Sequence, residues 1–487
     1  MARKKTSDVL RIGVTFPRPD GPGPVQWGAR MNSSLAAGFR PAHEVMGKAL
    51  EELVRCGFQV TTQGRLTCSI RGTRRNFEKT FGTKLSRISM PSDETAHYSA
   101  DSVYYPGPGA PWNPRPQLKE LIDDAYIQWP HIYMNQLFNP PPSPLPPRIG
   151  YHHLRVPGDV VMLLSAAKVQ RAGVTGKGVR VVMVDSGFAH GHPYFQQMGY
   201  NTATVLAPGA TQREEDGNGH GTGESANLLA IAPDVTFIGV KLDNEEDPDA
   251  GASLLEGFQE ALTHNPDIVS VSLGFDLVEP DSGRKPQSSL PNGQVALEAE
   301  VAQAVADGVI VVFSAGNGHV SFPGMMPDVI SSGGVYVDEQ GGMQASSYSS
   351  AFASQIYPGR NVPDFCGLVG LIGNRAEYIM LPVPPGSQID RVRGENDGTG
   401  KEDGWGVFSG TSAAAPQLAG ICALLLQKNP HLTPGDIKAV LRRTCRDVSQ
   451  GAAHPASNQF NALAAGPGID AATGAGLVDA FAAFSQV

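Results

Sequence analysis

Three residues of this chain have the side chains that nucleophilic catalysis requires, and each stands in a glycine-containing turn. Asp185 ends an apolar run and precedes Ser-Gly, His220 lies between two glycines, and Ser412 follows Gly-Thr and precedes three alanines. A serine hydroxyl becomes a nucleophile when an imidazole takes its proton and a carboxylate keeps that imidazole in the right tautomer. In such a set Ser412 would attack a carbonyl carbon, His220 would act as general base, and Asp185 would orient His220.

The elements expected around these residues would bring them to one place. Asp185 ends a predicted buried strand over 178–185, and His220 begins a predicted helix that runs toward residue 232. Ser412 begins a second predicted helix, over 412–427, which is apolar nearly all round and therefore expected to be central. The carboxyl ends of parallel strands form the ligand-binding edge of an α/β sheet. The free N–H groups at a helix start, with the helix dipole behind them, would favour an oxyanion there.

Apolar strands alternate with amphipathic helices through most of the chain after residue 150. The further predicted strands are 235–242, 267–274 and 308–317, and the further predicted helices are 252–264 and 294–307. Continuous apolar strands that alternate with helices imply a parallel sheet covered by helices on both faces. The sequence therefore predicts the α/β fold class for this part.

The ordered motifs resemble those of the subtilisin-like serine peptidases (subtilases), over roughly residues 150 to 487. The order Asp, His, Ser is that of subtilisin and differs from that of chymotrypsin and of the α/β-hydrolases. The resemblance implies a subtilisin-like fold and a serine endopeptidase that forms an acyl-enzyme on Ser412. The alternative is a catalytically silent, subtilase-like protein that binds a peptide or serves as a scaffold.

The same resemblance implies the rest of the site. Asn317, in Ser-Ala-Gly-Asn-Gly after a predicted strand, would donate its side-chain amide to the oxyanion, although Asn-Gly alone is a common turn. Residues 272–274, Ser-Leu-Gly, match the strand whose backbone pairs with the main chain of the substrate. The substrate-binding residues implied in this way are Ser272, Leu273, Gly274, Ala315 and Gly316.

Residues 1–125 have the pattern of a separate unit. The predicted elements are a strand at 10–16, a helix at 42–56, hairpin strands at 58–62 and 66–70, a helix at 74–81, and a last strand at 85–88 or 98–105. That order is the split βαβ, or ferredoxin-like, α+β pattern. Residues 70–82 resemble the activation domain of sedolisin and kumamolisin precursors, and subtilase propeptides share this fold. The resemblance implies an intramolecular chaperone and inhibitor, and the alternative is an unrelated ferredoxin-like interaction module.

A proline-rich segment follows this unit. Residues 139–147 read Asn-Pro-Pro-Pro-Ser-Pro-Leu-Pro-Pro, which favours an extended, semi-rigid connector. We therefore expect a propeptide-like domain over 1–125, a linker over 126–150 and a peptidase domain over 151–487. The tether could let the segment after Asp124 lie in the active-site cleft, and autocleavage would then fall between about Trp129 and Tyr151.

Composition narrows the classes of partner. A net charge of −9 argues against nucleic acid, which needs a basic face. No apolar run reaches the ~18 residues of a membrane span, and the N-terminus lacks the apolar core of a signal peptide. Five scattered cysteines without a CxxC pair fit free thiols in the cytoplasm. The expected partners are a peptide or protein substrate and the chain's own N-terminal domain.

Three acidic features of the sequence lead to further expectations. Glu224, one helical turn after His220, could raise the pKa of the imidazole or point to solvent. Residues 243–249, expected at the rim of the cleft, contain five acids in seven residues, which predicts either a mild preference for basic substrate side chains or a solvated loop. The acids of 395–403 could bind calcium as in many subtilases, but their spacing matches no calcium loop. No cofactor and no metal site is therefore assigned.

Overall fold

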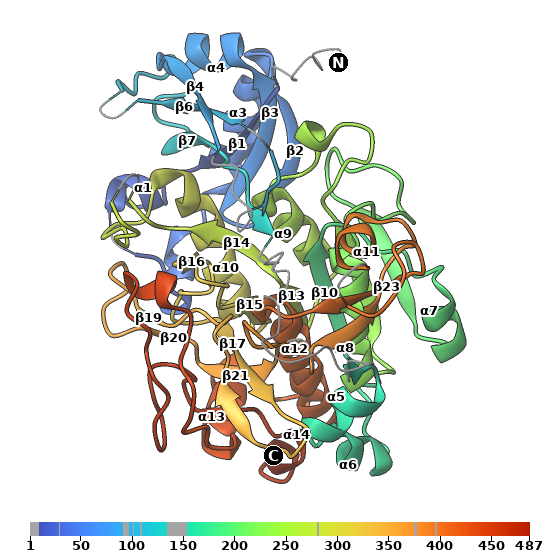
Figure 1. Ribbon diagram of the computed structural model, residues 1–487. Coiled ribbons are helices and arrows are strands. Elements are labelled where there is room, and N and C mark those ends of the chain that lie inside the picture. Colours follow the sequence, from blue (N-terminus) through green and yellow to red (C-terminus); the bar gives the residue numbers. More distant parts are fainter. Residues whose placement is uncertain are drawn as a thin grey trace.

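The protein consists of a smaller N-terminal part, blue in Figure 1, at one end of a larger α/β part. The computed structural model describes residues 9–28, 30–90, 97–100, 102–107, 110–133, 153–279, 282–374, 377–394 and 397–487. The proline-rich segment 139–147 lies outside the described residues. Among the described helices, none combines the length and the apolarity needed to span a membrane.

The N-terminal part is built on a four-stranded antiparallel sheet of order β2-β3-β1-β7. Its elements are β1 (Val9–Thr15), α3 (His43–Arg55), β2 (Gln59–Gln63), β3 (Thr67–Thr73), α4 (Arg74–Phe81) and β7 (Asp124–Ile127). Met46, Ala49 and Leu53 recur every three or four residues on α3 and are buried, which explains why this segment packs as a helix. The predicted ferredoxin-like α+β pattern is confirmed.

The last strand of this sheet is not either of the two predicted segments. Those segments form β4 (Leu85–Ser89) and β6 (Ser102–Pro106), which pair with each other in a separate two-stranded sheet. Leu85 on β4 and Val103 on β6 still pack against the N-terminal core, but the edge of β1 pairs with β7, whose Ala125 and Ile127 are buried in that core. The expected domain boundary after residue 125 thus falls inside β7.

The larger part contains an eight-stranded sheet of order β11-β12-β10-β13-β15-β17-β18, with β21 also paired to β17. All its pairs are parallel except β17 with β18. The strands are β10 (Arg180–Asp185), β11 (Thr202–Leu206), β12 (Thr236–Lys241), β13 (Ile268–Val271), β15 (Ile310–Ser314), β17 (Ile330–Val337), β18 (Met343–Ala345) and β21 (Phe365–Leu368). The chain proceeds from β10 to β12 on one side and from β13 to β21 on the other, so the strand order reverses between β10 and β13.

Helices cover both faces of this sheet, as predicted. The main ones are α8 (His220–Ile231), α9 (Leu254–Thr263), α10 (Val295–Ala306), α12 (Thr411–Lys428), α13 (Pro434–Thr444) and α14 (Ala480–Phe484). Strand β10 shows the two faces, because its alternate side chains enter different cores. Val181 and Met183 lie in the core formed with α8 and α12, whereas Val182 and Val184 lie in the core formed with α9 and α10.

Candidate active site

The carboxyl end of β10 brings an acid and an imidazole together. Asp185 is the last residue of β10 and His220 is the first residue of α8. Asp185 Oδ1 and His220 Nδ1 are 2.7 Å apart, and both side chains are fully buried. The N–H of Ser186 also donates to Asp185 Oδ1, at 2.7 Å. This contact holds the imidazole in the orientation that a general base needs.

The start of α8 is held by Asp216, a residue that the sequence analysis missed. Its Oδ1 accepts from the N–H of Gly219 at 2.9 Å, and its Oδ2 accepts from the N–H and the hydroxyl of Thr222 at 2.9 and 2.6 Å. Gly219 has φ of 93°, which favours glycine directly before His220. The position of Asp216, four residues before the histidine that begins the helix, could have indicated this role, because acidic residues stabilise helix N-termini.

The predicted nucleophile lies at the start of α12, beside the strand that follows the reversal of strand order. Ser412 is the second residue of α12. Its hydroxyl donates to the backbone oxygen of Ser272 at 3.4 Å, and the Ser272 hydroxyl donates to the backbone oxygen of Ser412 at 2.9 Å. Because Ser272 directly follows β13, both Asp185 and Ser412 lie at the strand ends where open α/β sheets bind ligands.

Asn317 lies against the same helix start. Its Oδ1 accepts from the N–H of Thr411 at 2.8 Å and from the Thr411 hydroxyl at 3.0 Å. With the amide oxygen held in this way, the Nδ2 end is directed along Gly410, where an added Cβ would lie 2.5 Å from it. The Thr411 hydroxyl also accepts from the N–H of Gly316, at 3.1 Å. The preceding residue, Ala315, is buried and its N–H donates to β17.

The strand expected to bind substrate is already paired with another segment of the chain. Leu273 and Gly274 begin β14 (Leu273–Asp276) and pair antiparallel with β8 (Ile132–Tyr133), with Leu273 opposite Tyr133 and Gly274 opposite Ile132. The other edge of β8 pairs with β5 (His97–Tyr98). The segment that follows the N-terminal sheet thus adds a strand beside Ser272, the hydrogen-bond partner of Ser412.

Carboxylates dominate the electrostatics of the site. Burial opposes protonation of His220, but the carboxylates of Asp185, Glu224 and Asp216 outweigh it and raise the pKa of the imidazole. Burial also raises the pKa of Asp216. Of the two alternatives for Glu224, the solvent-facing one is wrong, because the side chain is buried with Oε1 3.9 Å from His220 Nε2.

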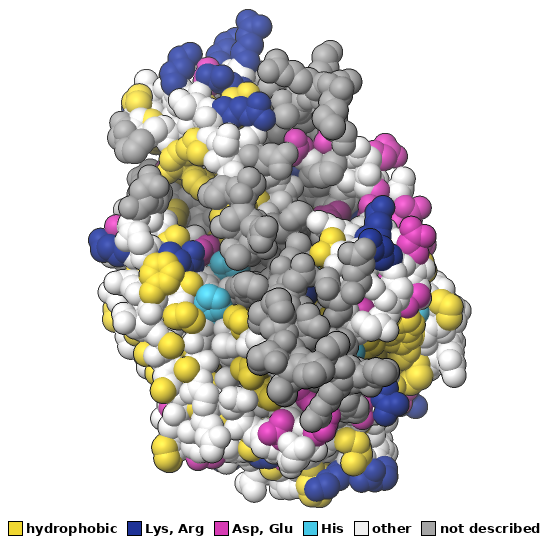
Figure 2. Space-filling model, viewed as in Figure 1, with side chains coloured by type: hydrophobic (Ala, Val, Ile, Leu, Met, Phe, Trp, Pro, Cys, Tyr) yellow, Lys and Arg dark blue, Asp and Glu magenta, His cyan; other side chains and the backbone are white. Residues whose placement is uncertain are grey.

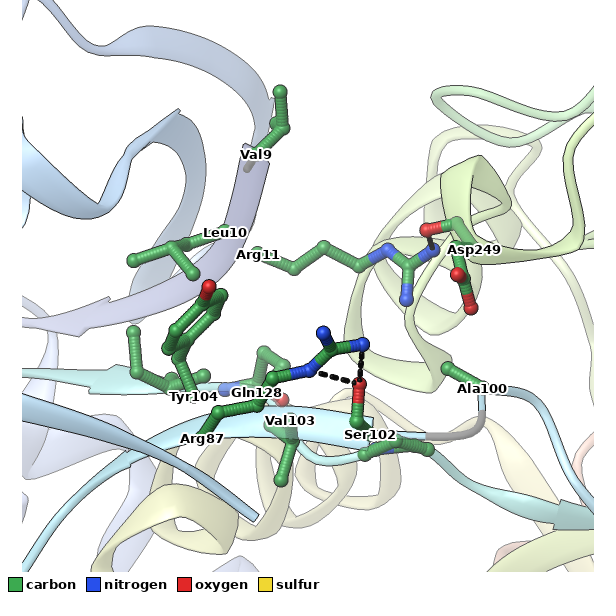
Figure 3. Close-up of a pocket in the computed structure, with 12 residues that line it drawn as sticks. Val9, Leu10, Arg11, Arg87, Ala100, Ser102, Val103, Tyr104, Gln128 and Asp249 are labelled. Atoms are coloured by element: carbon green, nitrogen blue, oxygen red, sulfur yellow. Dashed lines mark hydrogen bonds between the residues drawn. The ribbon is translucent and has the colours of Figure 1, made fainter. Parts of the chain in front are cut away.

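The acidic rim loop 243–249 meets cations of the protein itself. Glu245 Oε1 accepts from the buried ammonium of Lys241 at 2.6 Å. The Arg11 guanidinium donates to the backbone oxygen of Asp249 at 2.5 Å. Arg11 and Arg87 point into one pocket between the N-terminal part and this loop (Figure 3), so that pocket belongs to the contact of the two parts.

On the face shown in Figure 2, Lys and Arg gather over the α4 end, and Asp and Glu gather on the larger part.

Two acids of the stretch 395–403, Asp397 and Asp403, accept hydrogen bonds from nearby backbone N–H groups. Asp397 Oδ1 accepts from the N–H of Thr399 at 2.9 Å, and Asp403 Oδ2 accepts from the N–H of Gly400 at 2.6 Å. Over the described residues, no group of three or more His, Cys, Asp or Glu side chains is arranged to hold a metal ion. No metal site is assigned to this stretch.

Known proteins share both sequence and fold with this chain. The family model described as "Subtilase family" matches residues 176–476. The chain is 26% identical to subtilisin E of Bacillus subtilis (strain 168) over 297 residues, which cover 58% of this chain and 64% of that protein. It is 30% identical to the serine protease AprX of the same strain over 308 residues, which cover 57% of this chain and 64% of that protein. The chain thus spans about 64% of the length of these curated relatives.

Two solved structures show the likeness of fold. The crystal structure of fervidolysin from Fervidobacterium pennivorans, a keratinolytic enzyme related to subtilisin, matches with a TM-score of 0.56 and 17% identity, over 100% of this chain and 62% of that chain. The crystal structure of a lanthipeptide protease matches with a TM-score of 0.51 and 20% identity, over 67% of this chain and 94% of that chain. The fervidolysin match includes the N-terminal part.

Proposed function

The chain belongs to the subtilase family, and from that premise we propose that it is a serine endopeptidase that hydrolyses peptide bonds through an acyl-enzyme on Ser412. The observation that carries this proposal is the 2.7 Å contact of buried Asp185 with His220 at the edge where Ser412 begins α12. A scaffold protein has no need of a buried acid–imidazole pair, because burying polar groups costs free energy.

In the proposed mechanism Ser412 Oγ attacks the carbonyl carbon of the scissile peptide bond while His220 Nε2 takes the hydroxyl proton. Asp185 stabilises the imidazolium through Nδ1. The Asn317 amide and the N–H groups at the start of α12 stabilise the oxyanion. When the C–N bond breaks, His220 gives its proton to the leaving amine. Water then attacks the acyl-enzyme with His220 again as the base, which releases the acid product and restores Ser412.

We propose further that the N-terminal part inhibits this site until it is displaced or cut. Supporting this, β8 pairs antiparallel with Leu273 and Gly274. A substrate that adds a strand to β14 needs the same backbone groups, so β8 and substrate compete. The proposed inhibitory unit therefore extends past residue 125 to include β7 and β8.

A chaperone role for the N-terminal part finds support on α9 and α10. Glu300 Oε1, on α10, accepts from the N–H and the hydroxyl of Thr67 at 2.9 and 2.7 Å. Glu256 Oε1, on α9, accepts from the Thr61 hydroxyl at 2.8 Å and from Arg71 Nε at 3.2 Å. Both carboxylates are buried against the N-terminal part. Without that part these groups would lose donors, which makes the helices less favourable to form alone.

A fluorophosphonate probe tests the proposed peptidase activity. We expect it to label the full chain at Ser412 and to leave Ser412→Ala unlabelled. If folded wild type takes no label, with or without prior cleavage of the N-terminal part, the catalytically silent alternative holds.

Sequencing of the N-terminus tests autocleavage. In wild type stored at neutral pH, we expect a new N-terminus between about residues 129 and 151, because β8 (Ile132–Tyr133) pairs with the strand that begins directly after Ser272, the hydrogen-bond partner of Ser412. Ser412→Ala should stay whole. Wild type that stays whole would indicate a retained regulatory domain that another factor must displace.

We also infer a cytoplasmic location. All five cysteines, each in the described part of the chain, are free thiols, which suits a reducing compartment. Recovery of the protein mainly outside the cell on fractionation would contradict this inference.

A further inference from the structure

Glu224 occupies a position next to the reacting nitrogen of the proposed general base. It lies one helical turn after His220 on α8, its side chain is buried, and its Oε1 is 3.9 Å from His220 Nε2. Asp185 contacts the other ring nitrogen, Nδ1. The imidazole is therefore flanked by a carboxyl group at each of its two nitrogens.

A chain of buried side chains holds Glu224 in place. Its Oε2 accepts from Asn227 Nδ2 at 3.0 Å, and Asn227 Oδ1 accepts from Gln417 Nε2 on α12 at 3.5 Å. Gln417 Oε1 accepts from the N–H of Leu368 on β21 at 2.7 Å. Glu224 is thus tied through two helices to the sheet and cannot turn to solvent without breaking these bonds.

Glu224 Oε1 has no hydrogen-bond donor among the described residues. A buried carboxyl oxygen without a donor costs free energy, and such a group calls for a functional explanation. The only cationic partner within reach of this oxygen in the described structure is His220 in its protonated form.

The charges around the pair come from few groups. The ionisable groups that face it are Asp185 on β10 and Asp216 in the segment before α8. The facing side chain on α12 is the neutral Gln417, and β23 (Trp405–Phe408) contributes the Phe408 ring, 6.2 Å from the imidazole. Burial raises the pKa of Glu224 to about 8, against the opposing effect of His220. The negative charge of Glu224 is therefore favoured when His220 is protonated.

We propose that Glu224 is a positioning residue for His220, which stabilises the protonated imidazole from the Nε2 side and so sets the lowest pH at which His220 can act as a base. This inference rests on the proposed function of His220. No bond to Glu224 forms or breaks in it, since the proton of Ser412 passes to His220 Nε2 alone. A stabilised imidazolium releases its proton at higher pH. On acidification, wild type should therefore lose activity at a higher pH than a variant without the carboxylate.

NMR titration of His220 tests this inference without needing turnover. The samples are full-length Ser412→Ala and full-length Ser412→Ala with Glu224→Gln, because glutamine keeps the shape and can still accept from Asn227. We expect the titration midpoint of His220 to fall by about one pH unit or more in the double variant, the scale of a nearby opposite charge. An unchanged midpoint would overturn the inference, whether or not the protein proves to be a peptidase.

The pH profile of kcat/KM provides the second measurement. Glu224→Gln should shift the acid limb to lower pH, so that the variant exceeds wild type at the acid end, and Glu224→Asp should return the limb toward the wild-type position. The matched control is Glu298→Gln, which removes another buried carboxyl, on α10 and bonded to Tyr357. An equal shift in Glu298→Gln would overturn the inference, and failure of wild type to take the fluorophosphonate label would instead defeat the proposed function alone.

Discussion

At the scale of single residues, hydrogen bonds to the start of a helix decide which atoms face the proposed reaction centre. The Asn317 amide has two ends of similar size, and Thr411 selects between them by donating twice to the oxygen. The NH2 end is thereby assigned as the donor toward the helix start. An aspartate at this position would offer only acceptors, so the residue type matters as much as the place.

Asn317→Ala should lower kcat by ~10²–10³, because one oxyanion donor is lost. KM should change much less, since the oxyanion forms only after binding. Steady-state kinetics on a peptide substrate would measure both constants. Asn461→Ala, an exposed position near the C-terminus, serves as the control for general effects of the substitution. If kcat falls by less than about tenfold, Asn317 does not act as an oxyanion donor.

The sequence predicts Asp185, His220, Asn317 and Ser412 as site residues because local motifs carry them, but it does not predict which side chains support them. Asp216 and Gln417 act across 6 and 49 residues of sequence, as in Asp216 with Thr222 and Gln417 with Leu368. Contacts of that kind depend on how α8 and α12 pack, and no short pattern reports them. The same limit explains Glu224, whose burial follows from that packing and could not be read from its spacing alone.

At the scale of elements, the N-terminal part packs against helices α9 and α10. The tip of the hairpin between β2 and β3 approaches α10 so closely that the fit depends on a missing side chain: a Cβ on Gly64 would overlap the carboxylate of Glu300. The same carboxylate accepts from the N–H groups of Leu66 and Thr67. Docking is therefore specific to the shape of this hairpin.

Gly64→Ala should loosen the docked hairpin and lower the free energy of unfolding of the full chain by about 1–3 kcal/mol, the usual scale for overpacking. Urea denaturation of the Ser412→Ala background would measure it. Gly38→Ala is the matched control, because a Cβ there meets nothing within 4 Å. Equal stability of the two variants would contradict the tight approach at Gly64.

Stability should also depend on pH through α10. Burial raises the pKa of Glu298 from 4.5 to about 7, with Arg30 opposing. The folded state thus prefers the protonated acid, so this group's contribution is complete below about pH 4.5 and is lost as the pH rises to about 7. The loss amounts to about 3 kcal/mol. Urea denaturation should therefore show that the free energy of unfolding of Glu298→Gln rises relative to that of wild type as the pH increases across this range. A difference in free energy that does not change with pH would contradict the assignment.

At the scale of the whole molecule, the strand order was only partly predictable. The sequence predicts four of the eight strands of the large sheet, because each of these is a mainly apolar run, but it does not predict β11, β17, β18 or β21. Strand β11 has only two large apolar residues, Val205 and Leu206, and β21 contains Cys366 and Gly367. Neither strand therefore forms a clear apolar run in the sequence. The pairing of β8 with β14 joins residues about 140 apart and could only be framed as a possibility from the tether.

A fragment of residues 151–487 should refold poorly alone, because Glu256 and Glu300 would be left without the donors that the N-terminal part supplies. Adding residues 1–133 in trans should restore native circular dichroism and probe labelling. Refolding of the fragment at the same rate and yield without that addition would show that the N-terminal part is not a chaperone.

The alternation of side chains along β10 has one more consequence. Val181 and Met183 face the helices that carry His220 and Ser412, and Val182 and Val184 face the helices that the N-terminal part grips. One strand thus serves as a partition between a chemical half and a docking half. Substitutions on the surfaces of α9 and α10 can therefore change how the N-terminal part docks, while the helices that carry His220 and Ser412 keep their own packing. This separation makes the molecule modular and a natural scaffold for engineered control.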